Sequence, residues 1–252
     1  MTTDEHRNQV NKNAVRIRGI AWVLLILLPL SALGSRFGLW PHTIGLLLLM
    51  LSIFGSLLIQ IVNAIWLLRK PNLATKSALR WACLFALPPL VIAATVIRGA
   101  SDSDSSERIA IHNISTDINN PPRFSAAKEQ RGTDSNPLEY SSQTASNQQK
   151  LYPDLSPIDS SLSTSQAFAT ALTISRELGW KVYAEDINSG HIEAVDSTFW
   201  FGFKDDIVIR IQASNSGSVI DLRSVSRVGQ GDMGANNQRI RAFIDLFNQQ
   251  TQ

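Results

Sequence analysis

The chain has 252 residues with 23 Lys and Arg against 21 Asp and Glu, and its mean hydropathy of zero hides an apolar part before residue 99 and a polar remainder. Residues 109–252 hold 12 basic and 16 acidic residues, so the basic surplus flanks the apolar part and indicates membrane orientation rather than nucleic-acid binding. The single cysteine, Cys83, lies in an apolar stretch, which excludes a disulfide framework or a cysteine-based zinc cluster from the polar part.

Three apolar stretches approach or exceed the roughly 20 helical residues that cross a bilayer. They run from about Ile17 to Leu33, Thr43 to Leu68, and Leu79 to Ile97. The first stretch is also compatible with a cleaved signal that ends near Ala32-Leu33-Gly34, although 18 residues would be a long leader before its apolar core. We predict a cytoplasmic tail at residues 1–18 and a lipid-embedded region of about three helices at residues 19–98.

Basic residues are distributed unequally around these stretches. One side carries eight (Arg7, Lys12, Arg16, Arg18, Arg69, Lys70, Lys76 and Arg80) and the other three (Arg36, Arg98 and Arg108). The positive-inside rule then predicts a multi-pass protein of the inner (plasma) membrane with a cytoplasmic N-terminus and a periplasmic or otherwise extracytoplasmic C-terminal domain. Because no charged residue lies at membrane depth in these spans, where Arg18 and Arg80 stand only at the ends, transport is disfavoured. Ser52, Ser56, Gln60 and Asn63 are expected to pack helices together.

The polar part begins with a predicted linker at residues 99–108, and residues 109–252 are long enough for one hydrophobic core. A strand is expected at Ile109 to Ser115. The segment from Ser125 to Thr164 has little periodicity and is expected to wrap the surface or to be partly mobile. A helix is expected with Thr164 or Ser165 as its N-terminal cap and with Gly179 as its stop.

Four strand-like runs and a last helix follow. The runs lie at about Lys181 to Ile187, His191 to Phe201, Asp205 to Ala213, and Ser218 to Arg227, and the helix at about Met233 to Gln249 with Asp232 as its cap. Short turns predict antiparallel pairing of the strands. Alternation of apolar and polar residues along the runs predicts one apolar face and one polar, solvent-exposed face of the sheet. The predicted fold is therefore a membrane helical region followed by an α+β domain with an antiparallel sheet and two helices on one face.

Several long motifs in the polar part resemble one known family. They are "IHNISTDINNPPRF", "YPDLSP", "GHIEAVDST…GFKDDIVIRI" and "DLRSVSRVGQGDMGANNQRIRAF". In this order they resemble the DUF1499 family of bacterial and plant proteins, over Ile111 to Phe243. The resemblance implies the boundaries of the domain at residues 109–252, but it supplies no reaction, cofactor or catalytic residue.

The most concentrated set of candidate ligand-binding residues surrounds the glycine-rich entry to the last helix. Arginines and free amides at a helix N-terminus can hold a carboxylate or phosphate. The candidate anion-binding residues are Arg210, Arg223, Arg227, Ser224, Ser226 and Asn236. The alternative, which we favour, is that the arginines pair with Asp196, Asp206 or Asp221 while Asp232 occupies the helix terminus.

The sequence offers little catalytic chemistry in this domain. Its histidines are His112 and His191, each more typical of a solvated or cross-strand residue than of a base, and "GxSxG", "HExxH" and phosphate-loop motifs are missing. Asp205 and Asp206 are expected in an exposed turn rather than at a cation. We predict no metal, cofactor or nucleic acid, and a binding or interaction module of the cell envelope for a protein or an anionic small molecule. An envelope hydrolase or lipid-modifying enzyme is the alternative.

Overall fold

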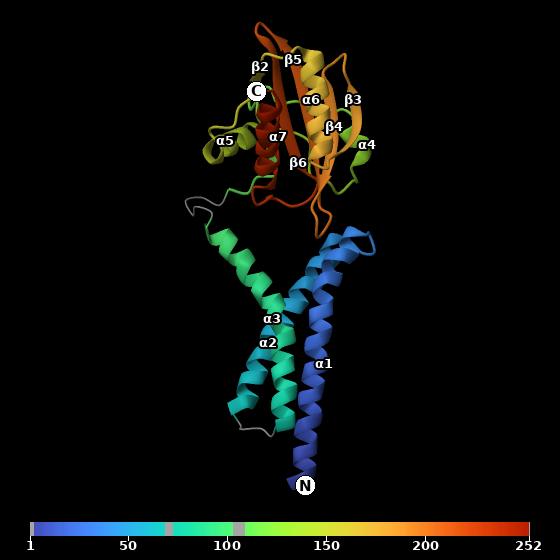
Figure 1. Ribbon diagram of the computed structural model, residues 1–252, viewed down its shortest axis with the longest axis vertical. Coiled ribbons are helices and arrows are strands. Elements are labelled where there is room, and N and C mark those ends of the chain that lie inside the picture. The colour runs from blue at the N-terminus through green and yellow to red at the C-terminus, as the bar shows by residue number, and fades with distance from the viewer. Residues whose placement is uncertain (1–2, 69–72, 103–108, 252) are drawn as a thin grey trace. The chain divides into compact units, whose positions relative to one another are not determined.

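The computed structural model describes residues 3–68, 73–102 and 109–251, which divide into a helical unit and a mixed unit (Figure 1). The helical unit contains α1 (Thr3–Arg36), α2 (His42–Leu68) and α3 (Leu73–Asp102). Each helix includes a stretch of 23 to 27 residues that is long and apolar enough to cross a membrane. The prediction of three membrane helices is therefore confirmed.

The ends of these helices differ from the expected ones. Helix α1 starts at Thr3, so it includes most of the tail expected at residues 1–18. Helix α3 starts at Leu73 and continues to Asp102, into the segment expected to be a linker. Residues 103–108 of that linker lie outside the described residues, as do Arg69 and Lys70, on which the predicted orientation partly rests.

Polar side chains join the three helices through backbone carbonyls. Ser52 Oγ on α2 donates to the Leu24 carbonyl on α1 at 2.8 Å. Gln60 Nε2 on α2 donates to the Cys83 carbonyl on α3 at 3.0 Å, and Asn63 Nδ2 donates to the Leu79 carbonyl at 3.4 Å. Such bonds satisfy polar groups that lipid cannot, so these side chains pack helices as predicted.

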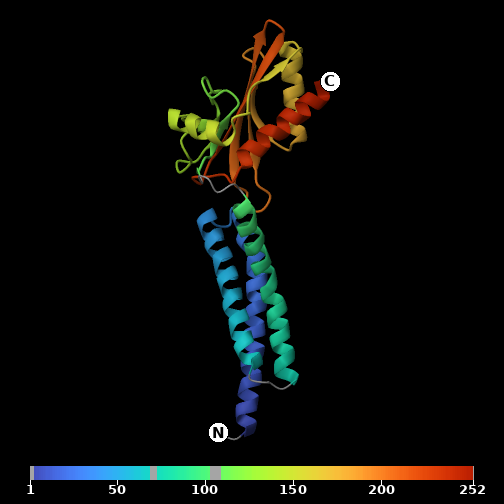
Figure 2. The same cartoon turned by 90° about the vertical axis from the view of Figure 1, so that its left-hand side faces the viewer.

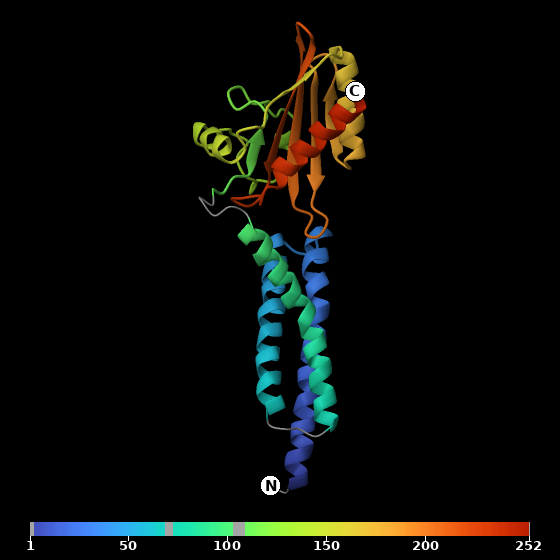
Figure 3. The same cartoon turned by 60° about the vertical axis from the view of Figure 1, so that its left-hand side comes forward.

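The mixed unit is a six-stranded antiparallel sheet with four helices (Figures 1 and 3). Its elements are β1 (Asn113–Ser115), α4 (Ala127–Gln130), α5 (Ser142–Leu151), β2 (Ile158–Ser160), α6 (Thr164–Glu177), β3 (Lys181–Asp186), β4 (His191–Ser197), β5 (Lys204–Ser214), β6 (Gly217–Ser226) and α7 (Ala235–Thr251). The strand order is β1-β6-β5-β4-β3, and β2 also pairs with β6. Asp205 and Asp206, expected in an exposed turn, are buried residues of β5.

One face of the sheet forms the hydrophobic core with α6 and α7. Isoleucines of the central strands, including Ile207 and Ile209, are fully or almost fully buried there. The rings of Trp180 and Phe243 stack with centroids 5.7 Å apart. Two helices thus cover one face of an antiparallel sheet, which confirms the predicted fold class.

The opposite face of the sheet is buried as well, so the prediction that it is exposed to solvent is wrong. Glu193 and Asp206 have no exposed surface, and Asp221 and Arg223 are only 2% and 3% exposed. The segment of residues 116–152, with α4 and α5, covers this face, and Figure 2 shows α5 and α7 on opposite sides of the sheet. Charged residues at alternate strand positions therefore form an internal polar layer, which we call the buried polar face.

Candidate functional site

The six residues predicted to bind an anion lie on opposite faces of the sheet. Side chains of successive strand residues point to opposite faces. Arg210, Arg223 and Arg227 therefore belong to the buried polar face. Ser224 and Ser226 lie under α7, and Asn236 lies on the face of α7 that packs on them. The structure brings each set of three together but keeps the two sets apart.

The set under α7 is satisfied by its own hydrogen bonds. Ser224 Oγ donates to Asn236 Oδ1 at 2.6 Å, and Asn236 Nδ2 donates to Ser226 Oγ at 2.9 Å. Arg239, which the sequence analysis did not single out, donates to Asn236 Oδ1 at 2.8 Å and pairs with Asp205 at 2.7 Å and Asp196 at 2.8 Å. These side chains are buried and mutually bonded, so they hold α7 against the sheet.

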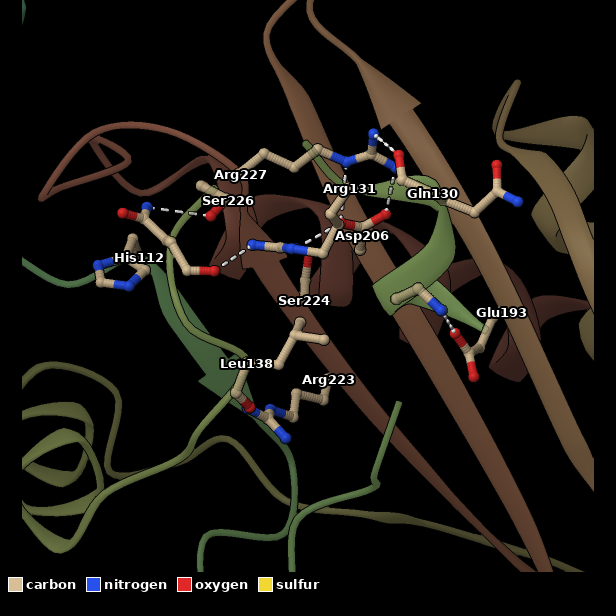
Figure 4. A network of polar contacts seen from close by, with 12 residues as sticks. His112, Gln130, Arg131, Leu138, Glu193, Asp206, Arg223, Ser224, Ser226 and Arg227 are labelled. Atoms are coloured by element: carbon tan, nitrogen blue, oxygen red, sulfur yellow. Dashed lines mark hydrogen bonds and ion pairs between the residues drawn. The ribbon is translucent and has the colours of Figure 1, made fainter. Parts of the chain in front are cut away.

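Two arginines converge on the carboxylate of Asp206 (Figure 4). Arg227 Nη2 lies 2.7 Å from Asp206 Oδ1, and its Nε lies 3.0 Å from Oδ2. Arg131, from the covering segment, pairs with Oδ2 as well. Arg227 also donates to the Gln130 carbonyl at 2.6 Å. This ion triad therefore attaches the covering segment to β5, and the predicted pairing of an arginine with Asp206 is confirmed.

Arg223 is buried among neutral partners. It donates from Nε to Asn113 Oδ1 at 3.0 Å, from Nη1 to the Pro122 carbonyl at 3.1 Å, and from Nη2 to the Leu138 carbonyl. Its guanidinium also lies 5.3 Å from the ring centroids of Phe124 and of Tyr140. Burial lowers the pKa of Arg223 to about 10. The side chain is fully engaged in holding the covering segment, which leaves few donors for a ligand.

Glu193 anchors the covering segment at residues 125–127. Its Oε2 accepts from the Ala127 amide at 2.7 Å, and its Oε1 accepts from the Ala126 amide at 3.0 Å and from Ser125 Oγ at 2.6 Å. Burial alone would raise its pKa, but hydrogen bonds from His191, Ser125 and the amides outweigh burial and lower the pKa to about 2. Glu193 is therefore an ionised carboxylate inside the domain.

Ser125, His191 and Glu193 form a cluster that superficially resembles a hydrolytic triad. His191 Nε2 lies 2.8 Å from Glu193 Oε1 and 3.4 Å from Ser125 Oγ. Because an ionised carboxylate only accepts, Nε2 must carry the hydrogen and Ser125 Oγ must also donate to Glu193. The acceptor for the serine is therefore the Glu193 carboxylate, which is a weak base because its pKa is about 2, whereas a triad needs the histidine to accept the proton of the serine.

A cleft opens beside this cluster, with a volume of about 490 Å³. Its charged and polar lining includes Asn120, Arg123, Ser125, Asp186, His191 and Arg210. The floor is a row across three strands, because His191 in β4 is the register partner of both Asp186 in β3 and Arg210 in β5. Register partners point to the same face, so all three side chains face the cleft.

Arg210 and Arg123 differ in how far their charge is compensated. Arg210 pairs with Asp221 at 2.7 Å and Asp117 at 3.1 Å, and donates to the Asn120 carbonyl at 2.9 Å. The predicted pairing with Asp221 is therefore confirmed. Arg123 is exposed at the cleft, and within the described ranges of the chain it makes no hydrogen bond or ion pair. Arg123 is thus the cation available to a ligand.

The turn between β3 and β4 contributes Asp186 and Ser189 to the lining of the cleft. Gly190 has φ +64°, and a Cβ there would lie 2.1 Å from the Ile211 carbonyl oxygen, so only glycine fits. Asp186 Oδ1 accepts from the Asn188 amide at 3.0 Å and Oδ2 from Ser189 Oγ at 2.6 Å. These hydrogen bonds lower the pKa of Asp186, and the bond from the Ser189 hydroxyl has the largest effect. The turn therefore holds an ionised carboxylate at the cleft.

The family described as "Protein of unknown function (DUF1499)" matches residues 113–247, which is more than half of the chain. The chain belongs to the DUF1499 family. No curated protein matches it. The DUF1499 region therefore contains the sheet, the buried polar face and the cleft, and it follows three candidate membrane helices.

The DUF1499 cleft uses residues that the sequence analysis did not select. Of the six predicted site residues, Arg210 lines it, while Arg123 and Asp186 were not considered. The short turn between β3 and β4 was a usable signal, because it fixes Asp186 opposite His191. In residues 3–68, 73–102 and 109–251, no cluster of His, Cys, Asp and Glu could hold a metal ion.

Proposed function

We propose that this protein is a membrane-anchored binding module whose DUF1499 domain holds a small molecule through an anionic group in the cleft. The observation that carries the proposal is Arg123, an exposed and uncompensated guanidinium beside the polar floor made by His191 and Arg210. A guanidinium fork matches a carboxylate or phosphate with two parallel hydrogen bonds. The other candidate arginines are occupied by internal partners.

Binding is favoured over hydrolysis by the direction of the hydrogen bonds around Ser125. Its hydroxyl hydrogen goes to Glu193, and His191 Nε2 donates to the same carboxylate. A nucleophilic serine needs a base strong enough to take its proton, and a carboxylate with a pKa of about 2 is a weak one. The cluster instead supports the wall of the cleft, and a polar cleft with a few fixed charges suits recognition of a small ligand.

The binding experiment uses the full chain in detergent micelles, with inorganic phosphate and glycerol 3-phosphate as probes in isothermal titration calorimetry. The proposal expects both probes to bind the wild type, and Arg123→Gln to weaken binding at least tenfold. Lys128→Gln removes an exposed cation of α4 that does not line the cleft, and should leave affinity unchanged. Absence of heat and of any thermal shift with both probes would overturn the proposal.

We also propose that the DUF1499 domain lies on the extracytoplasmic side of the plasma membrane, because basic residues concentrate at the opposite ends of the spans. Cysteines at Ser142 and Ala74, each in a Cys83→Ser background, test this orientation in intact cells. An impermeant thiol reagent should label the cysteine at Ser142 and leave that at Ala74 unlabelled. The reverse pattern would place the domain in the cytoplasm.

A further inference from the structure

We infer that the ligand of this cleft is a zwitterion, with a phosphate group and an ammonium group joined by a short linker. The inference rests on the proposed anion-binding function and names the class of ligand that the same cleft would select. It comes from the charges that line the cleft, which have both signs. Arg123 supplies an uncompensated positive charge, and Asp186 supplies a negative charge on a carboxylate that its own turn holds in place.

The sheet fixes the width of the floor of the cleft, from Asp186 to Arg210. Asp186 lies in β3 and Arg210 in β5, with His191 of β4 between them in register. Neighbouring strands are about 4.8 Å apart, so the backbones at the two ends of the row are separated by roughly 10 Å. The Asn120 carbonyl accepts from Arg210, which ties the segment that carries Arg123 to the β5 end of the row.

The charges of Asp186 and Arg123 both remain available to a ligand. Asp186 accepts two hydrogen bonds within its own turn, and a carboxylate has about four acceptor sites, so roughly two remain. It is exposed and fixed by its turn, which makes it a preorganised partner for an ammonium group. Arg123 keeps its guanidinium donors for the phosphate.

The charge balance of the floor argues against a ligand of a single sign. Arg210 is compensated by Asp117 and Asp221, so it adds no free positive charge beside Arg123. Glu185 also lines the cleft, but it pairs with Arg176 at 3.5 Å. A simple anion bound at Arg123 would be repelled by Asp186 in the same cleft, and a simple cation bound at Asp186 would be repelled by Arg123. A zwitterion places each charge opposite its complement, so the cleft selects it against both single-charge analogues.

Two sources could supply this chemistry, a free metabolite or the headgroup of a phosphatidylethanolamine lipid. The experiment uses the full chain in micelles of a non-ionic detergent and compares phosphoethanolamine, glycerol 3-phosphate and ethanolamine by calorimetry. Phosphoethanolamine is expected to bind at least tenfold more tightly than either single-charge probe. Asp186→Asn keeps the Asx turn and should remove this preference, bringing phosphoethanolamine to the affinity of glycerol 3-phosphate.

The controls separate the inference from the proposed function. Asp134→Asn removes an exposed carboxylate outside the cleft and should preserve the preference for phosphoethanolamine. Arg123→Gln should weaken both phosphate probes. Equal affinity of wild type for phosphoethanolamine and glycerol 3-phosphate would overturn the zwitterion and leave the anion-binding function intact. No binding of either phosphate probe would overturn both.

The source is decided in nanodiscs. If the lipid headgroup occupies the cleft, discs that contain phosphatidylethanolamine should weaken the binding of added phosphoethanolamine relative to discs of phosphatidylglycerol alone. Equal affinity in both discs would assign the site to a free metabolite. In either case Asp186→Asn should remove the preference for the zwitterion over glycerol 3-phosphate, and its persistence in that variant would contradict the inference.

Discussion

Arg227 holds Asp206 through two parallel hydrogen bonds, Nη2 to Oδ1 at 2.7 Å and Nε to Oδ2 at 3.0 Å, on a carboxylate with no exposed surface. Arg131 binds the same carboxylate from the covering segment. Asp206 is therefore the single negative charge that two arginines share in this ion triad. Removing it leaves both guanidiniums without their counter-ion in a buried layer.

We expect Asp206→Asn to lower the free energy of unfolding of the domain by about 3 to 5 kcal/mol, the usual cost of breaking a buried ion pair by removing one partner. The measurement is a urea titration of the full chain in detergent, read by pulse proteolysis. Asp159→Asn, an exposed aspartate of β2, should change stability by less than about 0.5 kcal/mol. Equal loss in both variants would contradict a special role for the triad.

Glu193 should make stability depend on pH in the acid range. Its folded-state pKa of about 2 lies below the ordinary 4.5, so its stabilisation is complete above about pH 4.5 and is lost as pH falls toward 2. The difference between the two pKa values corresponds to about 3 kcal/mol at neutral pH. Wild type should exceed Glu193→Gln in stability at pH 7, and the gap should narrow between pH 4.5 and 2.

The control for this pH dependence is Glu129→Gln, which changes an exposed carboxylate of α4 near the same segment. Its difference from wild type should stay small across the whole range. A gap between wild type and Glu193→Gln that is constant from pH 7 to pH 3 would show that Glu193 is not held ionised by its hydrogen bonds.

Arg223→Lys should destabilise the domain although it conserves the charge. A lysine cannot reproduce the planar donors that reach Asn113, Pro122 and Leu138, so we expect a loss of more than about 2 kcal/mol. Arg176→Lys, whose side chain is 63% exposed, is the matched control and should be nearly neutral. Coincident unfolding curves of Arg223→Lys and wild type would mean that charge alone matters there.

Asp232→Ala should remove the cap of α7 and cost about 0.5 to 2 kcal/mol. Asp232 Oδ2 accepts from the Asn236 amide and Oδ1 from the Gly234 amide, both at 2.9 Å. Asp232→Asn retains a capping oxygen and should restore most of the stability. Thermal unfolding of the full chain in detergent measures both, and an alanine variant as stable as wild type would contradict the capping role.

Local patterns predicted the elements because each pattern has a local cause. The helix α6 was expected with Thr164 or Ser165 as its cap, but the cap is Ser163. Its Oγ accepts from the Gln166 amide at 3.4 Å while Gln166 Oε1 accepts from the Ser163 amide, so this reciprocal pair sets the start one residue earlier. The helix α7 was expected from Met233 but begins at Ala235, because Met233 and Gly234 have positive φ angles of 52° and 84°. The strand pairing followed from short turns.

The buried polar face could not be predicted from alternation alone, because a strand of alternating character looks the same whether water or a distant segment covers it. Its cover comes from contacts between residues far apart in sequence, such as Ser125 with Glu193 and Arg131 with Asp206. The cleft depends on the same cover, since Arg123 precedes Ser125 on that segment. The sequence was enough to predict that arginines of the sheet pair with its aspartates, as Arg210 does with Asp221. It was not enough to predict that Arg123 has no such partner.

The strand β6 carries a further consequence for the order in which the chain folds. The two three-residue strands, β1 and β2, both pair with β6. Asn113 of β1 is the partner of Val225, and Ile158 of β2 is the partner of Ile220. These partners are separated by 112 and 62 positions in the sequence, so neither pair can form until β6 has been synthesised. Such non-local closure slows folding. The apolar helices precede all of it, so membrane insertion can be complete while the domain still awaits its last strand, and assembly of the cleft is a late event of biogenesis.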